Sequence, residues 1–298
     1  MATQLNCSLT FAEAYYKRGN VYRAREKYDQ ALADYNQVIR LRPEYILIYH
    51  NRGEAYRNKG EYDRAIADYS QVIKLRPDSL WTYYHRGGTY SAKREYDQAI
   101  ADYGQAIELQ PDFAEAYYER GNAYSAKEEY SKAIADYSRA IQLNPDFEWA
   151  YHNRGDAYKV RGEYDRAIAD YSQAIQLKPD SEWSYHNRGV VYYAKDEYDR
   201  AIADYSHAIE LRLDFAEAYY SRGKAYEFKA MRSFNRLHAA SAEEDINRAI
   251  EDYSQAIELR PDFAEAYNRR GIIYSQKGET QKAIADFNKF ASLDKGAK

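Results

Sequence analysis

Glycine recurs along this chain at a fixed interval of 34 residues. The regular positions are Gly19, Gly53, Gly87, Gly121, Gly155, Gly189 and Gly223, and an eighth, Gly271, follows after 34 plus 14 residues. A fixed period of roughly 20 to 50 residues indicates a stack of supersecondary units, each of which buries its apolar face only against its neighbours. The sequence therefore predicts a solenoid, and its function is to be sought in recognition along a surface.

Each repeat carries two stripes of helical spacing. Around the first glycine stand Tyr15, Arg18 and Tyr22, and these offsets recur around all eight glycines. Residues spaced by three and four share one helix face, which predicts a first helix, helix A. A polar turn and a second stripe, as in residues 62–73, predict helix B. Each repeat is thus expected to be a helical hairpin with roughly 14 residues per helix.

The ends of the hairpins follow from proline, which cannot continue a helix. Helix B ends before Pro43, Pro77, Pro111, Pro145, Pro179 and Pro261. We expect an all-α solenoid of eight hairpins over residues 12–297, preceded by a leader at 1–11. The predicted repeats are 12–45, 46–79, 80–113, 114–147, 148–181, 182–215, 216–263 and 264–297.

Composition narrows the function. The formal charge is −4, from 43 basic and 47 acidic side chains, so a polyanion such as nucleic acid is not an expected partner. No segment reaches the ~20 apolar residues that span a bilayer, and the single Cys7 cannot form an internal disulfide. We expect a soluble cytoplasmic protein with no membrane partner and no cofactor.

Charged and aromatic framework residues are interpreted as structural. Every glycine is preceded by an arginine, and every repeat has an aspartate at a fixed place in helix B. A lone charge within an apolar stripe is costly, so we predict an Arg–Asp ladder between helices A and B that fixes their register. The alternative is two independently solvated charges. Most of the 35 tyrosines occupy fixed framework offsets and are expected in the core.

The consensus AYxxRGxxYxxxxxYxxAIxDYxxAIxLxPDF, nearly intact over residues 116–147, resembles the tetratricopeptide repeat (TPR). The resemblance covers residues 12–297. It departs from the family at the arginine before each glycine, at Leu213 in place of proline, and at Phe290 in the last repeat. It implies a right-handed superhelix of about eight repeats per turn, whose concave wall of A helices binds extended peptides.

All three tryptophans, Trp81, Trp149 and Trp183, stand six residues before a glycine. The resemblance implies that this offset faces the groove, where an exposed aromatic ring is a typical recognition anchor. The alternative is that each tryptophan closes a gap against the preceding helix B.

Histidine, asparagine and tyrosine recur three and two residues before the glycine on several of the predicted A helices. The candidates are His50, Asn51, Tyr84, Tyr118, His152, Asn153, His186 and Asn187. In the family, asparagine at this place can hold a peptide backbone, because its amide both donates and accepts. Asn20 with Asn51, and Asn122 with Asn153, match the two asparagines of the family's carboxylate clamp.

The basic residues of that clamp have no counterparts, because Tyr16, Trp81 and His85 stand in their places. An acidic chaperone tail is therefore not the expected ligand. Arg23 and Arg57, together with Lys159, would place scattered positive charge deeper in the groove, although solvated surface charge is an equal alternative.

A metal site is not predicted. His152 and His186 occupy equivalent places on consecutive A helices, but neither a cysteine nor an obvious carboxylate completes a ligand set.

The 14 extra residues of the seventh repeat fall around 229–245 and contain neither glycine nor proline. They predict a longer hairpin. Ser241 and Glu244 have capping-box spacing, which predicts that helix B starts at about residue 242. Met231, Phe234 and Leu237 could contact a partner, or pack along the hairpin.

The preferred function is a non-catalytic scaffold that binds an extended segment of a protein or peptide in the groove of A helices. The alternatives are a self-assembling structural protein and a sensor that responds to a small molecule, which would need a closed polar pocket. No nucleophile, base and acid set and no phosphate loop is found, so an enzyme is not expected. We expect a monomer or a weak end-to-end oligomer.

Overall fold

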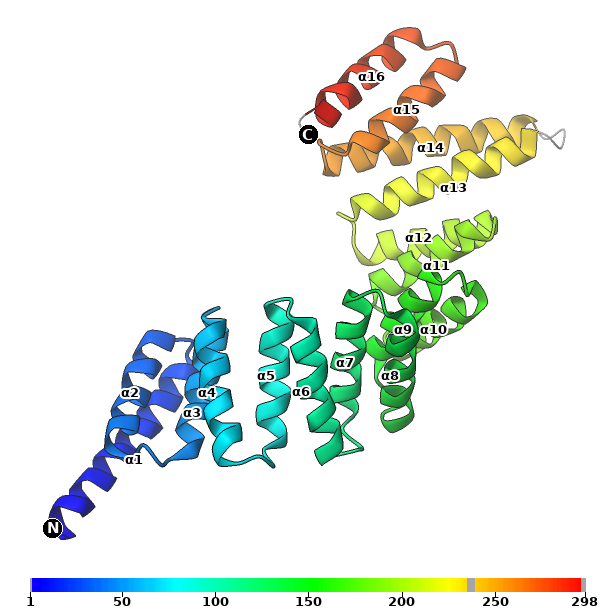
Figure 1. Cartoon of the computed structure of the whole chain (residues 1–298). Coiled ribbons are helices and arrows are strands. Elements are labelled where there is room, and N and C mark those ends of the chain that lie inside the picture. Colours follow the sequence, from blue (N-terminus) through cyan, green and yellow to red (C-terminus); the bar gives the residue numbers. More distant parts are fainter. Residues whose placement is uncertain (1, 235–238, 296–298) are drawn as a thin grey trace. The chain divides into compact units, whose positions relative to one another are not determined.

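The computed structural model describes residues 2–234 and 239–295, and it describes side chains over 10–232 and 240–294. Those residues form sixteen α-helices and contain no strand, which confirms the predicted solenoid of eight helical hairpins (Figure 1). The A helices are α1 Ala2–Ala24, α3 Ile46–Asn58, α5 Leu80–Ala92, α7 Ala114–Ala126, α9 Glu148–Val160, α11 Glu182–Ala194, α13 Ala216–Phe234 and α15 Ala264–Gln276. The B helices are α2 Tyr28–Leu41, α4 Tyr62–Leu75, α6 Tyr96–Leu109, α8 Tyr130–Leu143, α10 Tyr164–Leu177, α12 Tyr198–Leu211, α14 Ala239–Leu259 and α16 Thr280–Lys295.

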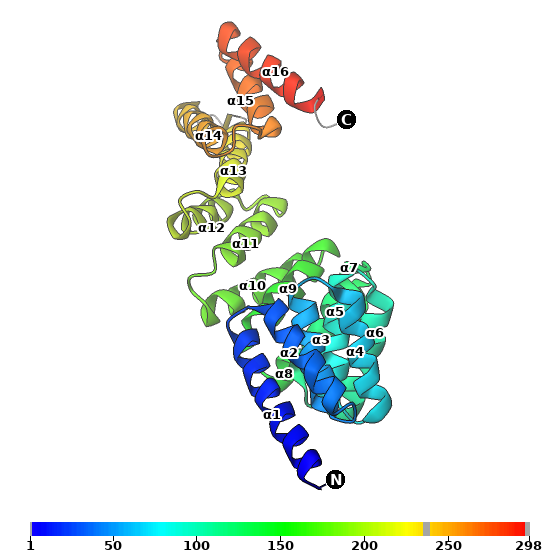
Figure 2. The ribbon, with the colours of Figure 1, turned by 90° about the vertical axis from the view of Figure 1, so that its left-hand side faces the viewer.

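The chain divides into two compact halves, Met1–Ala150 and Tyr151–Lys298, which we describe separately. In the N-terminal half, each A helix contacts the next, from α1 through α3 and α5 to α7. The B helices α2, α4 and α6 make no comparable contact with one another. The A helices of this half therefore form one continuous row, and its first member, α1, extends past α2 (Figures 1 and 2).

The repeating glycine is a packing notch for a tyrosine of helix B. A Cβ atom on Gly53 would lie 2.9 Å from Cε1 of Tyr69, closer than such atoms approach in proteins. Tyr69 is completely buried, and the equivalent tyrosine of every other repeat from the first to the seventh is also buried. At the last repeat Phe287 fills the notch of Gly271. The glycine is thus required by the ring that packs against it.

The Arg–Asp ladder is confirmed, and each pair lies within one repeat. Arg86 donates through Nε and Nη2 to the two carboxylate oxygens of Asp102, and through Nη1 to Ser70 of the preceding repeat at 2.9 Å. All eight pairs are two-pronged, with distances of 2.7–2.9 Å. Such planar, paired bonds specify orientation. The arginine therefore fixes helix A both to its own helix B and to the repeat before it.

The inserted residues lengthen both helices of the seventh repeat, as predicted. Helix α13 has 19 residues and α14 has 21, compared with 13 and 14 in an ordinary repeat. The predicted helix start at residue 242 is wrong, because α14 begins at Ala239 and Ser241 lies inside it. Consecutive alanines favour helix over a capped start. Met231 is exposed, whereas the side chains of Phe234 and Leu237 lie outside the described residues.

Helix α1 begins at Ala2, so it includes most of the segment expected to be a leader. In the part of the chain that the structure describes, no helix combines the length and the apolar character needed to cross a bilayer.

Candidate partner-binding surface

The three tryptophans are exposed on the A helices. Their exposed fractions are 56% for Trp81, 45% for Trp149 and 40% for Trp183. The ring of Trp81 also meets Phe113 edge to face at 5.1 Å, and Trp183 meets Phe215 at 4.6 Å. Each of these two rings therefore packs on the phenylalanine that directly precedes the next A helix, and each remains partly exposed. Such an arrangement gives a rigid aromatic surface at little entropic cost.

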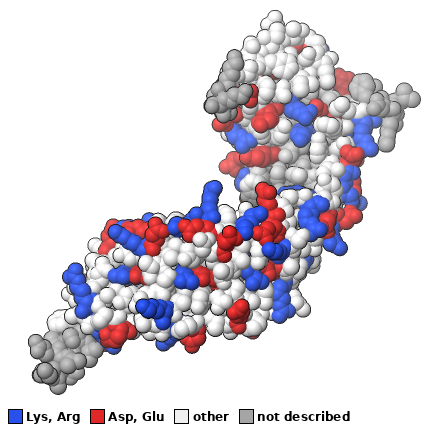
Figure 3. All heavy atoms as spheres, in the orientation of Figure 1, with Lys and Arg blue, Asp and Glu red and all other residues white. Residues whose placement is uncertain are grey.

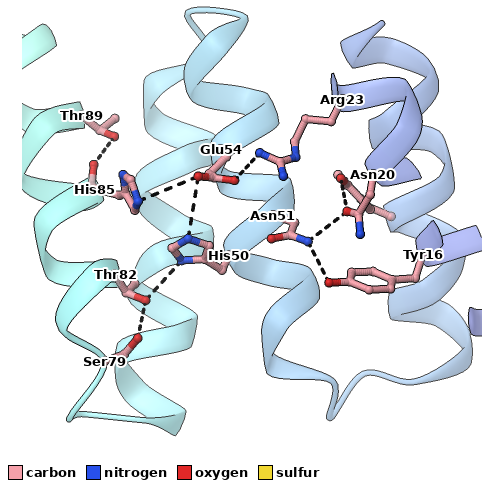
Figure 4. Close-up of polar contacts among 11 residues, drawn as sticks. Tyr16, Asn20, Arg23, His50, Asn51, Glu54, Ser79, Thr82, His85 and Thr89 are labelled. Carbon is pink, nitrogen blue, oxygen red and sulfur yellow. Dashed lines mark hydrogen bonds and ion pairs between the residues drawn. The ribbon is translucent and has the colours of Figure 1, made fainter. Parts of the chain in front are cut away.

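Asn20 and Asn51 form an amide pair on α1 and α3 (Figure 4). Asn51 Nδ2 donates to Asn20 Oδ1 at 3.1 Å and to the Tyr16 hydroxyl at 3.3 Å. Asn20 Oδ1 also accepts from the buried Tyr35 hydroxyl at 2.8 Å. Among the described residues, Asn20 Nδ2 and Asn51 Oδ1 have no partner. The pair is thus held in place, and one amide donor group and one amide oxygen remain free to bind another molecule.

Asn122, the predicted match of Asn20, has a different set of partners in the N-terminal half. Asn122 Oδ1 accepts from the Tyr137 hydroxyl at 2.9 Å, and its Nδ2 donates to Glu119 at 3.2 Å. Burial raises the pKa of Glu119, although the bond from Asn122 opposes this. Asn153 is half-buried on α9.

His152 and His186 lie beneath the surface of the C-terminal half. The sequence predicts contact residues at both positions, but the two residues are only 6% and 9% exposed. His152 Nδ1 lies 2.8 Å from Ser184 Oγ, and His186 Nε2 lies 3.2 Å from Ser221 Oγ. Burial lowers the pKa of His186 to about 4. These rings therefore support the surface from below.

Two other histidines converge on one carboxylate in the N-terminal half. His50 Nε2 and His85 Nε2 each lie 3.9 Å from Glu54 Oε1 (Figure 4). We call these three residues the histidine–glutamate cluster. Burial lowers the pKa of both histidines, to about 4 for His85, where the neighbouring His50 and two arginines add to the effect. Both rings are therefore neutral at pH 7.

The predicted positive charges differ in their contacts. Arg23 donates to Glu54 Oε2 at 2.5 Å, so its charge is already paired. Arg57 makes no hydrogen bond or ion pair with a described residue, and its Nη1 lies 3.7 Å from where a Cβ of Gly88 would be. Arg57 is therefore an unpaired cation on this surface.

Tyr84 and Tyr118 are half-buried. Tyr84 packs against Phe113 at 5.0 Å, and Tyr118 packs against Phe147 at 4.7 Å. Burial raises the pKa of Tyr84 to about 12. In sequence they lie between Trp81 and Trp149, on α5 and α7, and they add two aromatic rings to these A helices.

The C-terminal half contains a counterpart of the histidine–glutamate cluster, three repeats further along the chain. We call His152, Asp156 and Asn187 the histidine–aspartate cluster. Asp156 Oδ1 accepts from the Tyr171 hydroxyl at 2.7 Å, from Lys159 at 2.7 Å and from Asn187 Nδ2 at 3.3 Å. Burial opposes ionisation, but the bonds from His152 and Lys159 outweigh it and hold the pKa of Asp156 below its ordinary value.

The acidic residues of this surface are not among the candidates that the sequence predicts. Glu54 and Asp156 follow their glycines directly, at the offset where only Asn20 and Asn122 were considered. Glu227, in the inserted repeat, is buried, accepts from the Tyr253 hydroxyl at 2.6 Å and lies 3.4 Å from Arg269. The sequence does hint at them, because the residue directly after each glycine varies from repeat to repeat.

Charge on the rest of the surface is mixed. Basic and acidic side chains alternate over the face shown in Figure 3. A hollow of about 540 Å³ lies at the tips of the sixth and seventh hairpins and is wide open. It is lined by Asp196, Glu197, Tyr198, Asp199, Arg200, Lys229 and Arg232. Small-molecule sites are concave and mostly apolar, so this charged hollow does not resemble one.

The chain belongs to the tetratricopeptide repeat family. One family profile, described as TPR repeat, matches residues 19–60, 53–93, 89–127, 121–160, 155–196, 191–227 and 242–278, and a second, described as tetratricopeptide repeat, matches 264–296. Tetratricopeptide repeats are protein-interaction scaffolds, and this chain has their fold. A search of the curated proteins found no match.

Several solved structures are similar. MamA is 33% identical, with a TM-score of 0.53 over 55% of this chain and 96% of that one. YrrB, described as a TPR protein with an unusual peptide-binding site, is 22% identical, with a TM-score of 0.54 over 66% of this chain and 95% of that one. The C-terminal part of a repeat protein from Cytophaga hutchinsonii is 19% identical, with a TM-score of 0.68 over 84% and 97%. The last two support the fold alone.

Proposed function

We propose that this protein is a non-catalytic scaffold that holds an extended segment of a partner protein on the surface of its A helices. Two observations carry the proposal: the three tryptophans are exposed on A helices, and an amide pair on α1 and α3 has free hydrogen-bonding groups. The peptide-binding site named for YrrB is in keeping with it.

The chemistry fits a chain in extended conformation. Such a chain presents N–H and C=O groups that lack partners, and the free Asn20 donor and Asn51 acceptor match one of each. Trp81 offers an aromatic edge for an apolar side chain. Unpaired Arg57 adds a preference for a segment with some acidic character.

A peptide-display library panned on the immobilised protein tests this proposal. Peptides selected by the wild type are then assayed against Trp81→Ala and Asn51→Ala. Leu109, which is 43% exposed at the end of helix B of the third repeat, supplies the control Leu109→Ala. We expect the two A-helix variants to weaken binding by roughly tenfold or more, as loss of an interface anchor does, and the control to bind normally.

The proposal fails if the selected peptides bind Trp81→Ala and Asn51→Ala as tightly as the wild type. Sedimentation over a concentration series, run on the same protein without peptide, shows whether the surface is instead covered by a second copy. If the protein associates in a concentration-dependent manner and Trp81→Ala abolishes that association, the surface binds a second copy of this chain and not a foreign partner.

A further inference from the structure

Two imidazole rings and one carboxylate meet in the histidine–glutamate cluster. His50 and Glu54 are four residues apart on α3 and so share a helix face, and His85 reaches toward them from α5 (Figure 4). Their three ligand atoms all lie within 4.8 Å of one another. We propose that His50, Glu54 and His85 bind a divalent transition metal ion of the zinc class.

The two separations from Glu54 Oε1 are close to those of a zinc site, and the third, between the two histidine nitrogens, is at most 4.8 Å. Zinc lies about 2.0–2.2 Å from nitrogen and oxygen ligands, which places tetrahedral ligand atoms roughly 3.3 Å apart. The two nitrogen-to-oxygen separations of 3.9 Å are wider by roughly half an ångström. None of the three side chains is fully buried, since each is 18–19% exposed, so small rotations can close this gap. Three protein ligands leave a fourth position open.

Neighbouring groups already orient two of the ligands. His50 Nδ1 lies 3.3 Å from Thr82 Oγ1, which is itself 2.7 Å from Ser79 Oγ, so Nε2 is the nitrogen that faces Glu54. Arg23 binds Glu54 Oε2 and leaves Oε1 toward the two rings. Metal-binding histidines and carboxylates are held by outer contacts of this kind.

Buried polar atoms without partners gather around the same place. They include the Tyr69 hydroxyl, His85 Nδ1 and Arg23 Nε, all within or next to the cluster. Such atoms are rare in native structures and call for a specific explanation. Residues that break the ordinary rules of packing are expected where function has selected them.

The charges around the cluster determine what kind of group would occupy the fourth ligand position. Neutral imidazole is the form that binds a metal, and burial keeps both rings neutral at pH 7. Arg23 and Arg57 add positive charge, which weakens cation binding and favours an anion in the open position. A carboxylate of a bound segment would satisfy that preference.

Calorimetric titration with Zn²⁺ alone tests the site and needs no peptide, so its outcome is separate from that of the proposed function. The protein carries no affinity tag and has Cys7→Ser to remove the thiol. We expect one equivalent of Zn²⁺ per chain and no uptake of Mg²⁺. Co²⁺ in place of Zn²⁺ should give the visible absorption of a site with fewer than six ligands.

His85→Asn is the decisive variant, because asparagine occupies the corresponding position of the histidine–aspartate cluster at Asn187. It should weaken Zn²⁺ binding by more than about 100-fold, since loss of an outer contact alone costs roughly 10–100-fold. Glu54→Gln should do the same, and His186→Asn should leave binding unchanged. Circular dichroism verifies that each variant is folded. The proposal would be overturned if the parent protein bound no Zn²⁺, or if His85→Asn and Glu54→Gln bound Zn²⁺ as tightly as the parent protein.

Discussion

The histidine–glutamate and histidine–aspartate clusters occupy equivalent places in the two halves, yet their polar atoms are satisfied differently. In the C-terminal half the Tyr171 hydroxyl donates to Asp156 at 2.7 Å. In the N-terminal half the equivalent Tyr69 hydroxyl is buried without a partner, and the longer Glu54 turns to Arg23 and the two histidines. The two clusters differ by one methylene group in the acidic residue, by asparagine in place of His85, and by Lys159, which donates to Asp156, in place of unpaired Arg57.

This difference shows at which position otherwise uniform repeats can differ in their polar side chains. The glycine notch and the Arg–Asp ladder are the same in both halves and fix the helices. With the backbone set by these framework residues, a side chain directly after the glycine can change without disturbing the stack. We therefore expect function at the open cluster and stabilisation from the closed network.

The largest expected effect is the creation of a second metal site in the C-terminal half. Asp156→Glu combined with Asn187→His rebuilds the open cluster around His152. We expect the number of Zn²⁺ ions bound per chain to rise from one to two, measured by calorimetry in the Cys7→Ser background. If the number stays at one while the doubly substituted protein is folded, residue identity is not what distinguishes the two clusters.

Acid should destabilise the N-terminal cluster through His85. Burial lowers its pKa from 6.5 to about 4 in the folded protein. The unfolded chain therefore binds a proton more readily, so this stabilisation is complete above about pH 6.5 and is lost as the pH falls toward 4. The loss between pH 7 and pH 5 amounts to about 2 kcal/mol.

Urea unfolding of metal-free wild type and His85→Asn at both pH values measures this contribution. The wild type should lose more stability on acidification than the variant. Glu54, His50, Arg23 and Arg57 face the ring and are present in both proteins, so the difference isolates His85. Equal losses in the two proteins would show that His85 is not held neutral by burial.

The smallest effect should come from removing one hydroxyl in each half. Tyr171→Phe deletes a donor to Asp156 and should cost about 1 kcal/mol. Tyr69→Phe deletes a buried hydroxyl without a partner and should be neutral or stabilising. Urea unfolding of the two variants beside the wild type gives both values, and equal destabilisation would contradict the contrast between the clusters.

The fold was accessible from the sequence because it depends on periodic features. Gly53 and Tyr69, or Arg52 and Asp68, recur at one offset in every repeat except the seventh, where the insertion adds 14 residues, and Phe287 replaces the tyrosine in the last, so a single helical-hairpin geometry satisfies all of them. The start of α14 was not accessible, because Ser241 and Glu244 have the spacing of a cap and lie inside the helix. Local capping preference was overridden there by extension of the neighbouring helical turn.

The surface was only partly accessible. The offset of the tryptophans identified exposed rings, but it could not show that Trp81 and Trp183 also pack on Phe113 and Phe215. The histidine–glutamate cluster depends on the direction in which Glu54 points, which is set by contacts from other helices. Sequence spacing alone carries no information about that choice.

The A-helix surface can be tested through its own fluorescence, because all three tryptophans lie on it. Titration of the wild type with a selected peptide should shift tryptophan emission to shorter wavelength and protect it from acrylamide, since a bound segment removes water from rings that are 40–56% exposed. Binding that leaves both the emission and its quenching unchanged would place the partner elsewhere and contradict the proposal.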